Sequence, residues 1–507
     1  MTRGHESNPS YSLNEVPRWD FDLEIVVVGF GAAGASAAIE AATLGAQVGI
    51  FDVASGSGGT SAMSGGYIYF GGSGGTPAQR ENGFADATED FYRYMMMAGG
   101  PDADAARTRL YAEHALDHYR WLEEQGVSFR TTYVPGKRET PQTGDCLIWS
   151  GNEEAWPFNQ EATPCPRGHL PEAPGELGGK RLLETLASRV EDLAVEVHFD
   201  ARVTALVADE AQRVHGVVVQ IDGRLLFARA RKAVILCAGG FVLNQEMLRR
   251  YVPLAERLAG DCLSAGHDDG SGISMGLSVG GAAIHMDELF TTLPFYPPES
   301  HVKGILVNED GRRFINEDAY PGRVSVHCTR QGGDRIFLLV DDGIFEQPSE
   351  LSRISVAAVE ETWEDLEHSL GMGSGALAET VEFYNHHAAR GEDPSFHKVA
   401  KWLRPLDQPP FAALACHVGQ AFYPFFTLGG LSTRPTGEVL TEGGEVVEGL
   451  YAAGRNCCGL PRSAEGYSSG MSLGDCTFFG RLAGHSAAGL ESSPTSVAFG
   501  ATTGSET

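Results

Sequence analysis

The sequence predicts an α/β fold of two domains, in which the first domain is discontinuous and the second is an inserted α+β domain. Three observations predict it. With 507 residues, the chain exceeds what one hydrophobic core usually serves. A β-branched run at Ile25–Val28 leads through a glycine-rich turn into a small-residue helix at Ala35–Leu44. The same small-residue style returns from Gly429 onward, after a stretch of Pro-rich loops.

The domain boundaries follow from these changes of style. We expect the first domain to cover residues 22–285 and 429–491, and the inserted domain to cover residues 286–428. The tail, residues 492–507, is polar and predicted to be disordered.

The remaining elements follow from local patterns. Apolar runs predict strands at Gln47–Phe51, Val195–Phe199, Arg202–Ala208, Val214–Gln220, Leu225–Arg229 and Ala233–Leu236. We expect helices from Asp104 towards Glu124, with acidic residues at the start, and over Ala376–Ala389. Residues 55–72 form a Gly/Ser-rich loop in this interpretation.

The turn after the first strand has the spacing of a dinucleotide site. Gly29, Gly31 and Gly34 match G-x-G-x-x-G, and Asp52 ends the second strand 23 positions after Gly29. Gly29 permits the tight turn, Gly31 lets a pyrophosphate approach, and Gly34 allows close helix–strand packing, which predicts a Rossmann-like domain. Asp52 would accept a hydrogen bond from a ribose hydroxyl. Alternatively, it is a solvated carboxylate at a strand end. The motif does not separate NAD from FAD.

Composition excludes several function classes. The formal net charge of −29 disfavours binding to nucleic acid and to anionic membrane surfaces. Met1–Glu24 has no apolar core of a secretory signal, and no apolar run is long enough for stable membrane insertion. The nine cysteines include no C-x-x-C pair, so we expect no metal site and a reduced, cytoplasmic protein.

Six further segments carry a family resemblance. They are Gly58–Gly66, Val234–Gly240, Gly311–Glu317, Leu428–Leu431, Gly449–Gly454 and Gly470–Phe479. Together with the turn, they resemble flavoproteins of the fumarate reductase/succinate dehydrogenase type, in particular the 3-ketosteroid dehydrogenase branch. The resemblance implies FAD as the cofactor and a substrate-capping role for the inserted domain. Members that link flavin covalently carry a histidine where this chain has Gly59, so we expect non-covalent FAD.

The resemblance also implies the residues that hold the cofactor. These are Gly29, Gly31, Ala33, Gly34, Asp52, Gly59, Thr60, Ser61, Gly65, Gly66, Val203, Ala238, Gly239, Gly240, Asp268, Gly454, Ser472 and Leu473.

The substrate expectation depends on a departure from the family pattern. Dicarboxylate-handling relatives place a histidine where this chain has Phe426, at the end of the aromatic run Ala421–Phe426. This favours an apolar substrate, although the rings would equally suit a packed core. Arg313 is either a catalytic arginine inherited from the reductases or a partner in structural ion pairs.

Three residues are implied as catalytic: Tyr320, Tyr467 and Ser469. The Δ1-dehydrogenases usually carry Tyr-Pro-Gly-Pro-Gly where this chain has Tyr467–Met471, and the Tyr-Ser-Ser-Gly pattern resembles the 3-ketosteroid Δ4-(5α)-dehydrogenases. The resemblance implies an FAD-dependent oxidoreductase that introduces a C4–C5 double bond into a 3-ketosteroid. Tyr467 would polarise the ketone, and Ser469 would take the C4 proton with help from Tyr320. The alternative for each tyrosine is a buried residue whose hydroxyl bonds to the backbone.

Other interpretations stay open. One is a Δ1-dehydrogenase, and another is a reductase of an unsaturated acid, for which Arg313 and Arg434 would have to lie in the pocket. A third is a non-catalytic flavin electron carrier. His417 and the Cys457–Cys458 pair are interpreted as packing residues. The electron acceptor is of unknown identity, and the sequence does not predict the oligomeric state.

Overall fold

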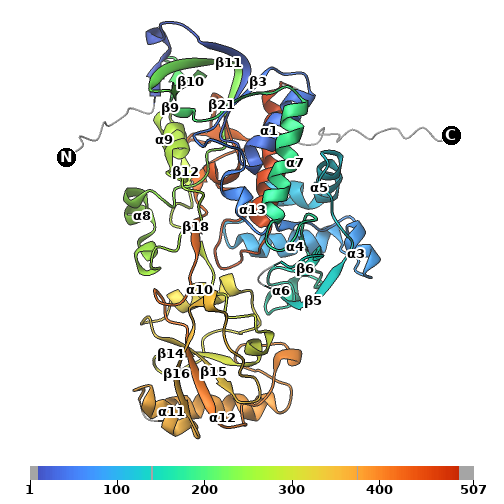
Figure 1. The fold of residues 1–507 in the computed structure, drawn as a ribbon, viewed down its shortest axis with the longest axis vertical. Coiled ribbons are helices and arrows are strands. Elements are labelled where there is room, and N and C mark those ends of the chain that lie inside the picture. The colour runs from blue at the N-terminus through green and yellow to red at the C-terminus, as the bar shows by residue number, and fades with distance from the viewer. Residues whose placement is uncertain (1–9, 139–140, 374, 490–507) are drawn as a thin grey trace, which may run out of the picture.

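The computed structural model describes residues 10–138, 141–373 and 375–489, so the predicted disordered tail, residues 492–507, lies outside the described part. Two bodies are stacked along the longest axis (Figure 1). The upper body combines both ends of the chain around a large sheet, and the lower body comes from the middle of the chain. The predicted α/β class, with a discontinuous first domain, is confirmed.

The large sheet forms the framework of the upper body. Its order is β1–β9–β10–β11–β2–β3–β8, with β21 also pairing with β11 and β20 pairing with β21. The strands are β1 Ser10–Ser12, β2 Phe21–Val28, β3 Val48–Phe51, β8 Glu196–His198, β9 Arg202–Ala208, β10 Val214–Ile221, β11 Arg224–Leu236, β20 Glu438–Leu440 and β21 Val446–Ala452. The parallel strands β11, β2 and β3 end together at the edge that carries the glycine-rich turn.

One strand prediction needs correction. Leu225–Arg229 and Ala233–Leu236 are not separate strands but the two halves of β11. Between Ala230 and Ala233 the register with β2 shifts, and Arg231 and Lys232 are exposed there. The irregularity keeps both charged side chains in solvent without ending the strand. The first half pairs with β10 and the second half with β21, so β11 connects the hairpin to the nucleotide edge.

Helices α1 (Ala32–Thr43) and α13 (Met471–Ala487) lie side by side and join the two ends of the chain (Figure 1). The first turn of α1 includes Ala32–Gly34, so it begins earlier than the predicted Ala35. A Cβ on Gly480 would lie 2.5 Å from the Ala33 carbonyl oxygen. A Cβ on Gly484 would overlap the Ala37 carbonyl oxygen. The late glycines therefore allow the C-terminal helix to approach the nucleotide-binding helix closely.

Further helices and a small sheet complete the upper body, with α8 and α9 on one side of it and α3–α7 on the other (Figure 1). The helices are α2 Gly59–Ala62, α3 Pro77–Glu81, α4 Thr88–Gly99, α5 Ala105–Glu124, α6 Phe158–Glu161, α7 Gly178–Asp192, α8 Gln245–Tyr251 and α9 Ser271–Ser278. The small sheet has the order β4–β7–β6–β5, from Ile68–Tyr69, Gly168–His169, Leu147–Trp149 and Tyr133–Lys137. The predicted helix towards Glu124 is confirmed, and the Asp104 side chain caps it by accepting from the Arg107 N–H. Within the described part of the chain, no helix is long and apolar enough to cross a lipid bilayer.

Two strand pairs join the bodies. β12 (Ala283–Ile284) pairs with β19 (Gly430–Leu431), and β13 (Leu289–Thr291) pairs with β18 (Phe425–Thr427). The boundaries predicted after residues 285 and 428 fall between these pairs and stay a prediction.

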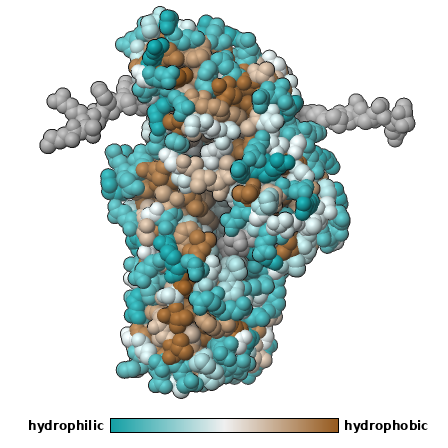
Figure 2. All heavy atoms as spheres, viewed as in Figure 1, coloured by the Kyte–Doolittle hydropathy of each residue, from teal (hydrophilic) through white to brown (hydrophobic). Residues whose placement is uncertain are grey.

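The lower body is a four-stranded sheet with helices. The order is β14 (Ile305–Asn308), β15 (Ile336–Asp341), β17 (Phe411–Ala415) and β16 (Ser355–Glu360). Helices α10 (Pro321–Thr329), α11 (Trp363–Ser369) and α12 (Ala376–Ala388) accompany it, and α12 confirms the predicted helix there. Figure 2 shows the whole molecule from the same side as Figure 1. Apolar and weakly polar residues lie along the hollow in the middle, with hydrophilic residues on both flanks.

Candidate functional site

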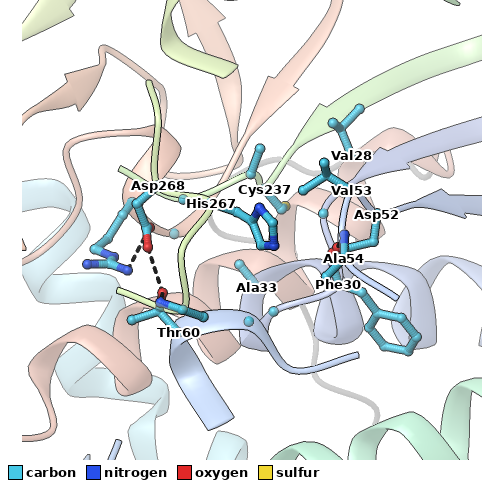
Figure 3. Close-up of a pocket in the computed structure, with 18 of the residues that line it drawn as sticks. Val28, Phe30, Ala33, Asp52, Val53, Ala54, Thr60, Cys237, His267 and Asp268 are labelled. Carbon is cyan, nitrogen blue, oxygen red and sulfur yellow. Dashed lines mark hydrogen bonds and ion pairs between the residues drawn. The ribbon is translucent and has the colours of Figure 1, made fainter. Parts of the chain in front are cut away.

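A crevice lies at the carboxyl ends of β2 and β3, beside the N-terminus of α1. Figure 3 shows Asp52 and Asp268 at opposite ends of it, with Ala33 between them. Ends of parallel strands next to a helix N-terminus are the usual place for a dinucleotide. The predicted cofactor residues that line the crevice are Gly29, Gly31, Ala33, Asp52, Gly59, Thr60, Ser61, Val203, Ala238, Gly239, Asp268 and Gly454.

The three glycines of the turn have different surroundings. Gly29 has φ +102°, and a Cβ there would lie 2.5 Å from the Cys237 carbonyl oxygen. A Cβ on Gly34 would overlap the Gly29 carbonyl oxygen, so both positions exclude any side chain. By contrast, the nearest atom to a Cβ on Gly31 is Ser61 Oγ at 3.5 Å. Gly29 and Gly34 thus serve packing, and Gly31 keeps the crevice open in front of α1.

Asp52 is held by the turn itself. One carboxylate oxygen accepts from the Phe30 N–H at 2.5 Å, and the other accepts from the Ala54 N–H at 2.7 Å. The carboxylate therefore keeps a fixed orientation at the crevice wall. Each oxygen retains a further lone pair that can accept from a ribose hydroxyl.

Asp268 joins four parts of the crevice at its other end. Its carboxylate forms an ion pair with Arg455 at 2.8 Å and accepts from Thr60 Oγ1 at 2.6 Å, Ser264 Oγ at 2.5 Å and the Gly240 N–H at 3.1 Å. Burial opposes ionisation, but Arg455 and the hydroxyl donors outweigh it and lower the pKa of the Asp268 carboxyl. Asp268 is consequently an anion that fixes segments more than 180 residues apart in sequence.

Three predicted cofactor residues line neither this crevice nor the chamber beside it. Gly34 packs inside the turn, Gly66 packs on the backbone of Gly178, and Gly240 donates its N–H to Asp268. They support the wall from behind. Each lies in a segment with other residues that line the crevice or the chamber, but glycine spacing alone does not show which backbone faces the cavity.

A chamber of about 390 Å³ continues from the crevice, and Thr60, Ser61 and Arg455 line both. This volume is within the usual range for small-molecule sites. Four of the rings that line it form one cluster: Phe290 lies 4.2 Å from Tyr467, 4.9 Å from Phe426 and 6.4 Å from Tyr320, measured between ring centroids. The predicted Gly65, Ser472 and Leu473 also line the chamber.

The three predicted catalytic residues all line this chamber. The Tyr320 hydroxyl lies 2.7 Å from Ser469 Oγ, and either group can be the donor. The Tyr467 hydroxyl donates to Ser472 Oγ at 2.9 Å. Burial raises the pKa of Tyr467 to about 12, so its phenol remains a proton donor at neutral pH. Both of these contacts are to side-chain hydroxyls.

The aromatic run before residue 427 divides between two environments. Tyr423 is fully buried and donates to the Cys416 carbonyl oxygen, and Phe425 is buried within the core. Phe426 faces the chamber, with the Arg455 guanidinium 5.3 Å from its ring centroid. The core interpretation therefore holds for Tyr423 and Phe425, whereas Phe426 lies at the cavity wall and the apolar substrate stays a prediction.

Arg313 is committed to structural contacts. It pairs with Glu317 at 2.8 Å and Asp393 at 3.1 Å, and its guanidinium packs on the ring of Tyr384. Neither Arg313 nor Arg434 is among the residues that line the described crevice and chamber. His417 bonds to the Ile336 carbonyl oxygen and packs on Phe337, as expected of a packing residue.

Several residues of the chamber wall were not predicted. They include Leu263, Phe290, Thr292 and Arg455. Arg455 directly follows the predicted cofactor residue Gly454, and this neighbourhood is the one signal for it in the sequence. Phe290 comes from β13 and faces the site only because it pairs with Phe426 across the joint.

The comparisons with known proteins agree with this geometry. A family model described as the FAD binding domain matches residues 24–469. The crystal structure of 3-ketosteroid-Δ4-(5α)-dehydrogenase from Rhodococcus jostii RHA1, in complex with 4-androstene-3,17-dione, is 39% identical with a TM-score of 0.88, and the match covers 95% of this chain and 99% of that one.

Two further relatives mark the range of similarity. The 3-oxo-5-alpha-steroid 4-dehydrogenase of Comamonas testosteroni is 29% identical, and the match covers 87% of this chain and 94% of that protein. A probable fumarate reductase of Shewanella frigidimarina is 27% identical, with 92% of this chain and 74% of that protein covered.

Proposed function

The chain belongs to the FAD binding domain family and is an FAD-dependent oxidoreductase, and on this premise we propose that it dehydrogenates a 3-ketosteroid between C4 and C5. The observation that carries the proposal is the Tyr320–Ser469 contact of 2.7 Å in an apolar chamber that adjoins the dinucleotide crevice.

The residues of the crevice fit FAD. The open space at Gly31 and the N-terminus of α1 suit the pyrophosphate, and the Asp52 carboxylate suits a ribose hydroxyl. Gly59 precedes Thr60 and has no side chain for a covalent link, in agreement with non-covalent FAD. When bound, FAD supplies the hydride acceptor.

The chamber residues supply the remaining chemistry. Removing hydrogens from the carbons α and β to a ketone separates into loss of a proton and loss of a hydride. The Tyr467 hydroxyl exchanges Ser472 for the ketone oxygen and stabilises the negative charge that develops there. Ser469 Oγ takes the proton from the α carbon while it gives its own proton to the Tyr320 hydroxyl oxygen, and Tyr320 in turn releases its proton towards solvent. Because serine alone is a weak base, the short contact to Tyr320 is what makes this step reasonable.

The substrate class is supported by the chamber wall. Phe290 and Phe426 give it an apolar surface that suits a fused-ring ketone, and the similar Rhodococcus protein is described with a steroid bound. A fumarate-like acid would need cationic partners for two carboxylates. Arg313 is paired elsewhere, so this alternative has less support.

The test is anaerobic reduction of the protein-bound flavin by the ketosteroid, in which the loss of flavin absorbance is measured over time. We expect a saturated 5α-3-ketosteroid to bleach the flavin in the wild-type protein. Reduction is expected to slow by about 10²-fold or more in Tyr467→Phe, Ser469→Ala and Tyr320→Phe. A matched control is Tyr423→Phe, which removes a buried hydroxyl that donates to the Cys416 carbonyl oxygen and does not line the chamber.

Two outcomes would reject the proposal. One is a wild-type flavin that no 3-ketosteroid reduces, and the other is unchanged reduction in all three variants. The position of the double bond in the isolated product distinguishes C4–C5 from C1–C2 desaturation.

A further inference from the structure

A short segment behind the chamber contacts both members of the Tyr320–Ser469 pair. We call residues 150–156, between β6 and α6, the strap. Tyr320 comes from the inserted domain and Ser469 from the C-terminal part of the chain, 149 positions later. Their hydroxyls therefore meet only if something fixes the two segments relative to each other.

The strap holds the Ser469 side through the backbone. The Ser469 N–H donates to the Ser150 carbonyl oxygen at 2.9 Å, and Ser150 Oγ donates to the Ser469 carbonyl oxygen at 2.8 Å. Gly151 lies so close that a Cβ there would overlap Ser468 Oγ. This pair of bonds fixes both the position and the rotation of the Ser469 peptide.

The strap holds the Tyr320 side through one side chain. Asn152 Oδ1 accepts from the Tyr320 N–H at 2.9 Å. Tyr320 is the N-cap of α10, with Pro321 after it, and an N-cap N–H has no partner within its own helix. Asn152 is fully buried, and it satisfies a donor that would otherwise be unpaired.

A buried phenol ties these two contacts together. The Asn152 N–H donates to the Tyr94 hydroxyl at 2.8 Å, and that hydroxyl lies 2.7 Å from Ser468 Oγ. Tyr94 is buried as well. Asn152 is thus bonded on one side to the residue before Ser469 through Tyr94, and on the other side directly to Tyr320.

The strap also reaches the inserted domain at two further points. Asn316 Nδ2 donates to the Trp156 carbonyl oxygen at 3.2 Å, and Lys401 pairs with Glu154 at 2.6 Å. Tyr320 therefore has little freedom to move independently of the strap.

We propose that Asn152 is a positioning residue, which holds the Tyr320 hydroxyl against Ser469 Oγ by fixing the backbone at the start of α10. This inference deepens the proposed function and rests on it. The chamber does not need Asn152 for its walls, since Asn152 is not among the residues that line it. Its contribution is the relative placement of two segments that carry the proton transfer.

The test replaces Asn152 with leucine, which has a similar size but no acceptor. We expect Asn152→Leu to lower the rate constant of flavin reduction by a saturated 3-ketosteroid by about 10²-fold, because displacement of about 1 Å in a reacting pair costs that much. FAD content and the dissociation constant of the ketosteroid are expected to stay within about twofold, since no chamber wall changes. Asn152→Asp keeps an acceptor oxygen and is expected to restore most of the rate.

A double-variant comparison separates positioning from general damage. In a Tyr320→Phe background, Asn152→Leu is expected to slow reduction by no more than about twofold further. The hydroxyl that Asn152 places against Ser469 is already absent there, so its position no longer matters. If the full loss appears again in this background, Asn152 does not act through Tyr320 and the proposal is wrong. Asn385→Leu makes the same exchange in α12, at a residue that likewise accepts from a backbone N–H, that of Leu406, and it is the matched control.

Hydrogen exchange provides a reading that is independent of turnover. The Tyr320 amide is bonded to Asn152, so peptides across the start of α10 are expected to exchange faster in Asn152→Leu than in Asn385→Leu. Unchanged exchange there, or unchanged reduction despite faster exchange, overturns the proposal. A wild-type protein that no 3-ketosteroid reduces rejects the proposed function instead.

A second variant covers the case in which Asn152→Leu does not fold. Tyr94→Phe removes the acceptor of the Asn152 N–H and the partner of Ser468. We expect reduction to slow by about three- to tenfold, with FAD content retained, in line with the loss of one or two buried hydrogen bonds. Reduction at the wild-type rate would count against the strap.

Discussion

The nucleotide crevice is formed by glycines that have no side chain, whereas the neighbouring chamber is formed by side chains from segments far apart in sequence. The crevice depends on Gly29, Gly31 and Gly34, within six consecutive residues. The chamber depends on Phe290, Tyr320, Phe426 and the segment from Tyr467 to Leu473, which leads into α13. The first kind of site is local and rigid, and the second exists only when the two bodies are correctly joined.

The largest expected effect concerns the crevice. Gly29→Ala puts a Cβ 2.5 Å from the Cys237 carbonyl oxygen at a φ of +102°. We expect this variant to lose about 3 kcal/mol or more of unfolding free energy, or not to fold. Urea unfolding and the flavin absorbance of the purified protein measure it.

Gly31→Ala is the matched control for that exchange. Its Cβ would approach nothing closer than 3.5 Å, so the unfolding free energy should change by less than about 1 kcal/mol. FAD affinity should fall by about tenfold or more, since a methyl group enters the space in front of α1. Equal destabilisation by both variants would contradict the assignment of packing to Gly29 and of ligand approach to Gly31.

The next effect concerns the link between crevice and chamber. Asp268→Asn removes the charge that pairs with Arg455 and weakens the acceptor for Thr60 and Ser264. We expect a loss of about 1–3 kcal/mol in unfolding free energy and weaker FAD binding. Fluorescence titration of the apoprotein with FAD gives the dissociation constant. Asp209→Asn, at a partly exposed ion pair with His215, should change neither quantity measurably.

A smaller effect separates wall from core at the joint. Phe425 and Phe426 are consecutive in β18, so their side chains point to opposite faces. Phe426→Leu should raise the KM for an apolar ketone by about three- to tenfold, because wall contacts are lost. Phe425→Leu should instead cost about 1 kcal/mol of unfolding free energy and leave KM unchanged. Steady-state kinetics and urea unfolding of both variants would expose a reversed assignment.

The smallest effect concerns the charges that join the chamber loop to α10. Glu465 lies two residues before Tyr467 and pairs with Arg323, His327 and Arg330. The hydrogen bond from His327, opposed by burial and assisted by Arg330 and Arg323, lowers the pKa of Glu465 from 4.5 to about 2.

A carboxyl whose pKa is depressed in the folded state stabilises the fold above its unfolded pKa and loses this stabilisation as the pH falls. Wild-type protein should therefore lose about 1 kcal/mol more than Glu465→Gln between pH 4.5 and pH 2. Urea unfolding across this range measures the difference. Parallel curves would show that Glu465 does not join the two segments energetically.

The same contrast explains what could be predicted from the sequence. The crevice was predictable because its requirements, a missing Cβ at Gly29 and a carboxylate at Asp52, occur at fixed spacing along one strand–turn–helix unit. Resemblance named Tyr320, Tyr467 and Ser469, and the structure places all three in the chamber. Their chemical roles stay a prediction.

Other features depend on contacts that spacing does not encode. Phe290 reaches the wall through its pairing with Phe426, and Asn152 reaches Tyr320 across 168 positions of sequence. The continuous strand β11 was predicted as two because exposed Arg231 and Lys232 interrupt its apolar pattern. Local hydropathy does not distinguish a break from an irregularity that keeps charges in solvent.

The paired strands β13 and β18 have a consequence for how such proteins diversify. Because the chain enters and leaves the lower body through hydrogen-bonded neighbours, the whole lower body could be exchanged for another module without disturbing the order of the upper sheet. The crossing point itself, however, carries Phe290 opposite Phe426. Recombination at the β13–β18 pair would therefore replace a residue that contacts the ligand together with the lower body. A change of domain and a change of ligand selectivity would then occur in one step.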